Sequence, residues 1–174
     1  MRYFLIPLLI FLCNGSYGQN TSLKNSDVIA LGLPLYAASV SYLKGDEKGL
    51  IQLGGSEALT LILAESLKLT TNRTRPDGSD NQSFPSAHTG VSFAAAQYLY
   101  KKGGWEYGLP AYALAGYVGY ARVDAKKHYW SDVIAGGLIG SLSAQSLTDT
   151  SIGNRLSLYV YPGAVGVLWQ TPIK

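Results

Sequence analysis

Cysteine, methionine, histidine and charge are all scarce in this sequence. Its 174 residues include one Cys, one Met and two His, and only 14% are charged. Cys13 and Met1 both lie near the N-terminus, so the rest of the chain can form neither a disulfide framework nor a cysteine metal site. Fourteen Lys and Arg against 11 Asp and Glu, without a polybasic run, argue against a nucleic-acid binder. A hydrophobic fraction of 47% excludes an intrinsically disordered chain.

The N-terminal segment has the pattern of a secretory signal. A short basic start precedes an apolar stretch at residues 4–12, and the small residues Ser16 and Gly18 follow at spacing suited to cleavage. We therefore predict a signal peptide over residues 1–18 and a single domain over residues 19–174. An uncleaved membrane anchor is the alternative. In a bacterial host, an exported chain of this kind is expected to be periplasmic or membrane-associated.

Long apolar runs alternate with polar segments in the rest of the chain. Turn and capping residues divide it into five predicted helices, near residues 25–42, 47–67, 86–100, 107–121 and 128–147. Short alternating runs around Pro162-Gly163 predict a small C-terminal β-hairpin. The predicted fold class is therefore mainly α, a helical bundle with a hairpin at its end.

None of the apolar runs reaches the length of about 20 residues that a membrane-spanning helix needs. The longest uncharged runs cover residues 28–43, 107–121 and 133–148. We therefore expect a compact exported protein that is soluble or loosely membrane-bound, and an integral membrane protein with short or tilted helices remains the alternative.

Polar residues with chemical potential are concentrated in three islands between the apolar helices. These islands are residues 68–76, 84–88 and 122–132, and they contain both histidines, His88 and His128. Arg side chains match the oxygens of phosphate, and a helix start offers free N–H groups to an anion. The islands therefore predict a phosphate site. Arg73, in the first island, is expected to be a solvated loop charge instead of a further ligand.

The histidines and one carboxylate predict phosphoryl transfer without a metal or another cofactor. His128 and Asp132 are four residues apart, so on a helix they share one face, and the Asp would fix the imidazole tautomer for attack. His88 can protonate the leaving oxygen. Taken singly, each residue has a plainer explanation: His128 with Asp132 is an ordinary helix pair, and Lys68 is within reach of Glu65.

The islands resemble the signature of the type 2 phosphatidic acid phosphatase superfamily, which includes class A acid phosphatases and vanadium haloperoxidases. That signature is Lys, six residues, Arg-Pro; then Pro-Ser-Gly-His; then Ser-Arg, five residues, His, three residues, Asp. This chain matches it over residues 68–132 at Lys68, Arg75, Pro76, Pro85, Ser86, His88, Arg122, His128 and Asp132. It departs from it at two positions, Ala87 in place of Gly and Ala121 in place of Ser.

The resemblance implies a helical-bundle phosphatase domain and a role for each matching residue. His128 would be the nucleophile that forms a phosphohistidine, Asp132 would orient it, and His88 would be the general acid. The phosphoryl oxygens would be bound by Lys68, Arg75, Arg122, Ser86 and the backbone N–H of Ala87. The methyl group of Ala87 is expected to reshape this cradle while its N–H remains.

These observations predict a metal-independent phosphatase for phosphomonoesters, with lipid phosphates and isoprenoid pyrophosphates as candidate substrates. The expected partner is therefore a phosphorylated small molecule or lipid, with no nucleic acid and with membrane association. Two alternatives are a vanadate-dependent haloperoxidase and an exported or membrane protein that binds phosphate without turnover.

Overall fold

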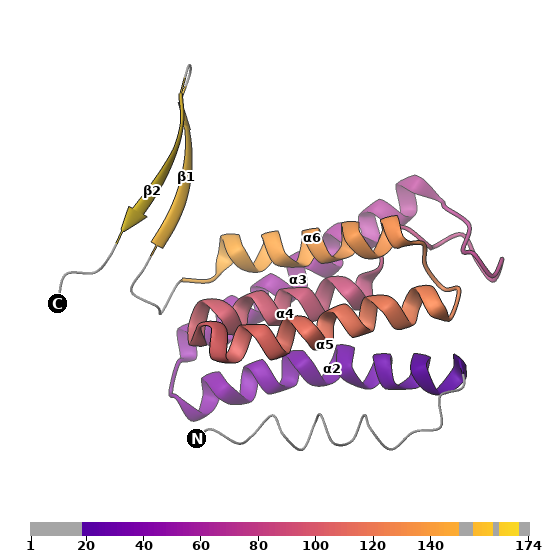
Figure 1. Cartoon of the computed structure of the whole chain (residues 1–174), viewed down its shortest axis with the longest axis horizontal. Coiled ribbons are helices and arrows are strands. Elements are labelled where there is room, and N and C mark those ends of the chain that lie inside the picture. Colours follow the sequence, from indigo (N-terminus) through magenta and orange to yellow (C-terminus); the bar gives the residue numbers. More distant parts are fainter. Residues whose placement is uncertain (1–18, 150–154, 162–163, 171–174) are drawn as a thin grey trace.

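The computed structural model describes residues 19–149, 155–161 and 164–170, and the predicted signal peptide lies outside these ranges. The described residues form five helices and a hairpin (Figure 1). Their bounds are α2 Gln19–Leu43, α3 Glu47–Thr71, α4 Ala87–Gly103, α5 Trp105–Asp124, α6 Trp130–Leu147, β1 Arg155–Tyr161 and β2 Ala164–Gln170. The predicted mainly α bundle is confirmed.

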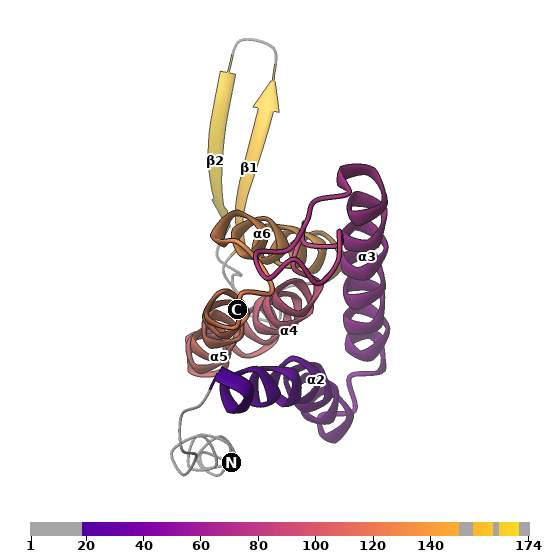
Figure 2. The same ribbon diagram turned by 90° about the vertical axis from the view of Figure 1, so that its right-hand side faces the viewer.

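Helix α4 lies at the centre of the bundle and packs against each of the other four helices (Figure 2). Small side chains make this position possible, because Ser92, Ala94, Ala95 and Ala96 are all completely buried. Larger core side chains come from α2 (Ile29 and Leu33), from α5 (Leu114 and Val118) and from the second half of α4 itself (Tyr98 and Leu99).

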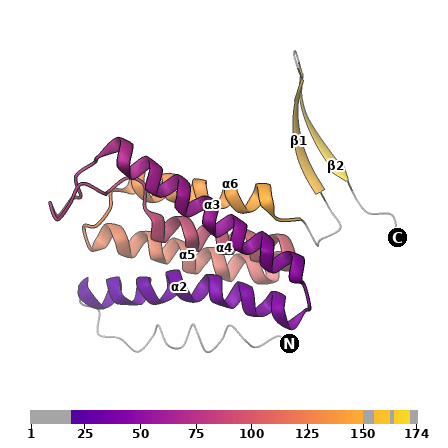
Figure 3. The same ribbon diagram turned by 180° about the vertical axis from the view of Figure 1, so that it is seen from behind.

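Consecutive helices run in opposite directions, so the connections gather at the two ends of the bundle. The α2–α3 and α4–α5 connections are short and lie at one end. The long α3–α4 connection and the α5–α6 connection lie at the other end, and α3 runs obliquely across the back (Figure 3). All three polar islands therefore come to the same end of the molecule.

Glycines on α6 let it approach α4 at backbone distance. A Cβ atom added to Gly136 would overlap the carbonyl oxygen of Ser86, and one added to Gly140 would overlap that of Gly90. Only residues without a side chain permit such an approach. The start of α4 is thereby fixed against the first half of α6.

Several helix boundaries differ from the predictions. Helix α2 begins at Gln19, well before the predicted start near residue 25, and Ser26 lies inside it with its hydroxyl donating to the carbonyl of Leu23 at 2.6 Å. Helix α3 continues to Thr71 and ends at Asn72, which adopts a left-handed conformation with φ of 44°. Helix α6 begins at Trp130, so His128 is not helical.

The predicted hairpin is also confirmed. Strands β1 and β2 pair antiparallel, with a register that runs from Arg155 opposite Gln170 to Tyr161 opposite Ala164. The Pro162-Gly163 connection lies outside the described residues.

Helices α2 and α3 are longer than the uncharged runs in the sequence. Each is long and apolar enough, by length and composition, to cross a membrane, although only 33% and 22% of their apolar windows are buried inside the protein. The prediction that the apolar segments are too short is therefore wrong for these two helices, because both continue through isolated polar residues.

Candidate active site

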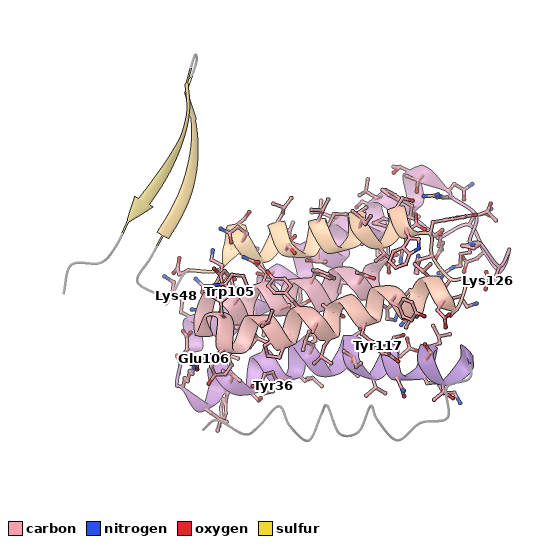
Figure 4. The ribbon with its side chains drawn as sticks, viewed as in Figure 1. Tyr36, Lys48, Trp105, Glu106, Tyr117 and Lys126 are labelled. Carbon is pink, nitrogen blue, oxygen red and sulfur yellow. The ribbon has the colours of Figure 1, made fainter. Side chains whose placement is uncertain are left out.

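The residues predicted for the site come together at one end of the bundle, at helix ends and in the loops that join them. Lys126 marks this end in Figure 4, and Lys48, Trp105 and Glu106 mark the opposite end. Lys68 lies in the last turn of α3, His88 in the first turn of α4, Arg122 in the last turn of α5 and Asp132 in the first turn of α6, while Arg75 and His128 lie in the connections.

His128 is buried and is held by a backbone carbonyl. Its Nδ1 lies 2.6 Å from the carbonyl oxygen of Ser83. A carbonyl oxygen can only accept, so Nδ1 carries the proton and Nε2 keeps a free lone pair. The predicted direct hydrogen bond from the His128 ring to the Asp132 carboxylate is wrong in this structure, because Oδ2 of Asp132 is 3.8 Å from Nδ1. The reason is that His128 precedes α6 and shares no helix face with Asp132.

Asp132 is completely buried and links two connections. Its carboxylate accepts hydrogen bonds from the Ser83 hydroxyl at 2.5 Å, from the Tyr129 N–H at 2.9 Å and from Arg73 at 2.6 Å. Its backbone carbonyl accepts from the N–H of Ser86 at 3.0 Å. Asp132 therefore joins the start of α6 to the segment that leads into α4, and it acts on His128 through Ser83.

Arg73 is not the solvated loop charge that the sequence predicts. Its Nη1 donates to Asp132 and, at 2.8 Å, to the Ser131 hydroxyl, and its guanidinium lies 4.2 Å from the centre of the Tyr129 ring. The partner Asp132 is 59 residues away in the sequence. Because the two residues belong to different islands, no local sequence pattern could have identified the contact.

Arg122 carries a hydrogen-bond donor that an anion could satisfy. The side chain is buried and forms an ion pair with Asp27 of α2. Its Nε is also buried, and it has no hydrogen-bond partner among the described residues. A buried guanidinium N–H without a partner is costly, and an oxygen of a bound phosphoryl group would satisfy it.

The other two predicted cations have partners of their own. Arg75 donates from Nε to Asp80 at 2.6 Å and from Nη1 to the carbonyl of Lys127 at 3.4 Å. Lys68 pairs with Glu65 at 2.7 Å, so the plainer alternative from the sequence is also present. The Lys68 side chain is nevertheless only 11% exposed.

Asp27 is a residue that sequence reasoning missed. Its Oδ1 pairs with Arg122 and lies 3.4 Å from Nε2 of His88. Helix α2 contains none of the polar islands, and Asp27 is 95 residues from Arg122 in the chain, so no spacing indicated it. It places a carboxylate between a predicted phosphate ligand and the predicted acid.

Ser86 and Ala87 form the helix start that the sequence predicts. Ser86 is buried, caps α4 by accepting from the Thr89 N–H at 3.5 Å, and exchanges a hydroxyl contact with Thr89 at 2.9 Å. Ala87 is the first residue of α4, so its N–H belongs to the first turn, where N–H groups have no intrahelical acceptor. This end of α4 can therefore attract an anion.

Both imidazoles have lowered pKa values. Burial lowers the pKa of His128 to about 4, with Arg75 and Arg122 acting in the same direction against the Ser83 hydrogen bond and Asp132. Partial burial lowers the pKa of His88 to about 4, supported by the positive charges of Arg122, Lys68 and Arg75 and opposed by Asp27. Both rings are therefore neutral at pH 7 in this structure. The shared dependence on Arg75 and Arg122 also indicates that the two rings belong to one electrostatic cluster.

Comparisons with known proteins show the family of this chain. The family model of the PAP2 superfamily matches residues 49–151. The lipid A 4'-phosphatase of Helicobacter pylori is 30% identical over 138 residues, which cover 73% of this chain and 70% of that protein. The chain belongs to the PAP2 superfamily. The match contains every predicted site residue of the three islands, whereas Asp27 lies outside it.

Two further comparisons add a relative and a fold for this PAP2 superfamily member. The lipid A 1-phosphatase of Porphyromonas gingivalis is 32% identical over 74% of this chain, which spans only 30% of that protein's length. The crystal structure of Aquifex aeolicus LpxE has a TM-score of 0.59 and 22% identity, covering 84% of this chain and 96% of that one. The latter likeness shows the shared helical fold.

The described residues contain no group of three or more His, Cys, Asp and Glu side chains that could hold a metal ion.

Proposed function

We propose that this protein is a phosphatase that hydrolyses lipid phosphates by transferring the phosphoryl group to His128. The observation that carries the proposal is the buried Nε of Arg122, which has no hydrogen-bond partner within the described part of the chain and lies in a cluster of three cations and two imidazoles. The names of the relatives, lipid A 1-phosphatase and lipid A 4'-phosphatase, support lipid phosphates as the substrate class.

The first step would be attack on phosphorus by the free Nε2 of His128. The P–N bond forms as the bond from phosphorus to the lipid oxygen breaks, and His88 donates a proton to that oxygen. In the second step, His88 accepts a proton from water, whose oxygen attacks the phosphohistidine. Inorganic phosphate leaves, and both histidines return to their starting states.

The cations would bind the three non-bridging oxygens of the phosphoryl group, which move with the phosphorus atom. Arg122 supplies the free N–H, and Arg75 and Lys68 add positive charge, with the first turn of α4 completing the cradle. The negative charge of the bound substrate would also raise the pKa of His88, so the acid gains its proton when the substrate arrives. Before the substrate binds, His128 is neutral at pH 7 because its pKa is about 4.

We further propose that the bundle is associated with a membrane, with the site at its periplasmic face. Helix α3 buries a stripe of mostly small residues and exposes large apolar ones such as Ile51 and Ile62, the reverse of a water-soluble helix. Exposed aromatic residues occur near both ends of the bundle, where membrane proteins carry them: Tyr42, Trp105, Tyr120 and Trp130. The predicted signal peptide supports the periplasmic side.

The test is release of inorganic phosphate in the presence of EDTA by the detergent-solubilised chain. The substrates are lipid A, phosphatidate, an isoprenoid pyrophosphate and p-nitrophenyl phosphate. His128→Ala should abolish release from all four, whereas Glu106→Gln, at the opposite end of the bundle, should leave it unchanged. Quenching with radiolabelled substrate should trap an acid-labile phosphoenzyme in the unmodified chain only. Release that persists in His128→Ala would refute the assigned nucleophile.

A further inference from the structure

Arg73 has no part in the chemistry above, yet it is the charged partner of a completely buried carboxylate. Its Nη1 lies 2.6 Å from Oδ1 of Asp132. The Ser131 hydroxyl and the Tyr129 ring hold the same guanidinium from two other directions. A buried carboxylate without a cation would be strongly unfavourable, so Arg73 compensates this charge.

A continuous set of contacts leads from Arg73 to the nucleophile. Asp132 accepts the Ser83 hydroxyl at 2.5 Å, and the Ser83 carbonyl lies 2.6 Å from Nδ1 of His128. The N–H of Ser83 in turn donates to the Arg73 carbonyl at 2.9 Å. Arg73 therefore holds Ser83 in two ways. The backbone carbonyl of Arg73 accepts the Ser83 N–H, and the Arg73 side chain holds the Asp132 carboxylate that accepts the Ser83 hydroxyl.

We propose that Arg73 is a positioning residue for His128, acting through Asp132 and Ser83, an inference that rests on the proposed function. Arg73 is not assigned to the phosphoryl group because its Nη1 is engaged with Asp132 and Ser131. Its role is to keep Asp132 in place, and with it the carbonyl that sets the tautomer and direction of the nucleophile.

The positive charge of Arg73 makes this role measurable through the pKa of His128, which a role in packing alone would not change. His128 faces Arg75 from the α3–α4 connection, Arg122 from α5 and Asp132 from α6. Arg73 offsets the negative charge of Asp132. Without Arg73, that carboxylate would act more strongly on His128, and the pKa of His128 would rise.

The experiment is an NMR titration of the two imidazoles in the detergent-solubilised full chain, with His88→Gln used to assign them. Arg73→Gln should raise the pKa of His128 by about one unit and lower kcat at least about tenfold. The KM and the inhibition by inorganic phosphate should change by less than about twofold. Arg73→Lys should keep the titration near that of the unmodified chain. Lys126→Gln is the matched control, because it removes an exposed cation from the α5–α6 connection. It should change neither the pKa of His128 nor kcat.

Ser83→Ala provides a second variant that does not change charge. It removes the hydroxyl that links Ser83 to Asp132, so kcat should fall while phosphate inhibition stays constant. Unchanged kcat and unchanged His128 titration in Arg73→Gln and Ser83→Ala would overturn the proposal. A higher KM and weaker phosphate inhibition at constant kcat would overturn it too, by making Arg73 a phosphate ligand. The titration does not need turnover, so an absence of phosphate release by the unmodified chain would count against the proposed function alone.

Discussion

The two histidines have similar pKa values but need opposite protonation states for the proposed reaction. His128 must be neutral to attack, which its burial and its cationic neighbours favour. His88 must be protonated to act as an acid, and the same kind of surroundings opposes this. Asp27 is the group that counteracts the cations at His88, so a residue of α2 influences the proton donor on α4.

The pH dependence of the reaction follows from these values. The neutral fraction of His128 rises as pH passes about 4, and the protonated fraction of His88 falls over the same range. We therefore expect kcat/KM to be greatest at about pH 4 to 5 and to decline towards neutrality. The profile of kcat should fall only at higher pH, because the bound phosphoryl group raises the pKa of His88. A kcat/KM that still increases between about pH 7 and 9 would contradict these assignments.

Asp27→Asn is the matched variant for this profile. It removes the negative charge that raises the pKa of His88, so the alkaline limb of kcat/KM should move to lower pH. Glu106→Gln removes a carboxylate at the opposite end of the bundle and should leave the profile unchanged.

Residues with motif spacing could be predicted from the sequence, and residues with only spatial proximity could not. His88, Arg122 and Asp132 stand at recognisable intervals, and the structure brings them to one end of the bundle. Asp27 and Arg73 contact partners 95 and 59 residues away. Such contacts depend on how the helices pack, which no interval within a loop or helix specifies.

Packing between α4 and α6 sets the position of the helix start that carries Ser86 and His88. Gly136 touches the Ser86 carbonyl so closely that an added methyl group would displace it. We expect Gly136→Ala to lower the free energy of unfolding by about 1 to 3 kcal/mol and to reduce activity beyond this loss of stability. Chemical unfolding in detergent and phosphate release, measured on the same sample, would test it.

Gly116 of α5 is the control for this substitution. It is also a helix glycine, but nothing lies within 4 Å of an added Cβ atom. Gly116→Ala should stabilise the protein slightly, by up to about 1 kcal/mol, and leave activity unchanged. Equal behaviour of the two variants would show that the contact between Gly136 and Ser86 does not matter.

Helix number and order were predictable from apolar runs and capping residues, but the boundary near the nucleophile was not. The sequence predicts that α6 begins near His128, which would place His128 and Asp132 on one helix face. Tyr129 caps α6 instead, and its N–H bonds to the Asp132 side chain. A tyrosine is not a common capping residue, so the sequence carried no clear signal for this start.

At the scale of the whole molecule, large apolar side chains remain on the outside. Ile62, near the middle of α3, is 63% exposed, and Leu69, near its end, is 82% exposed. In a water-soluble protein, replacing either by Lys would change stability by about 0.5 kcal/mol or less. In the proposed membrane arrangement, Lys at the helix centre would cost about 2.5 to 3.5 kcal/mol, whereas Lys near the end could reach the surface.

This difference provides a test of membrane association. We expect Ile62→Lys to lower the amount of folded protein recovered from the membrane fraction, and Leu69→Lys to leave it nearly unchanged. Recovery from the soluble fraction without detergent, with both variants equally stable, would show that the bundle is water-soluble.

The position of the site at the ends of the helices also fixes its distance from the centre of the bilayer in the proposed membrane arrangement. Helices α2 and α3 each have 25 residues, which corresponds to a length of about 37 Å. If the bundle is embedded along these helices, the reacting histidines lie at a constant level above the bilayer centre. A phosphate group would then be selected by its own depth in the membrane. The length of the attached acyl chains would matter less, and a phosphate carried far from the surface on an extended headgroup would lie out of reach.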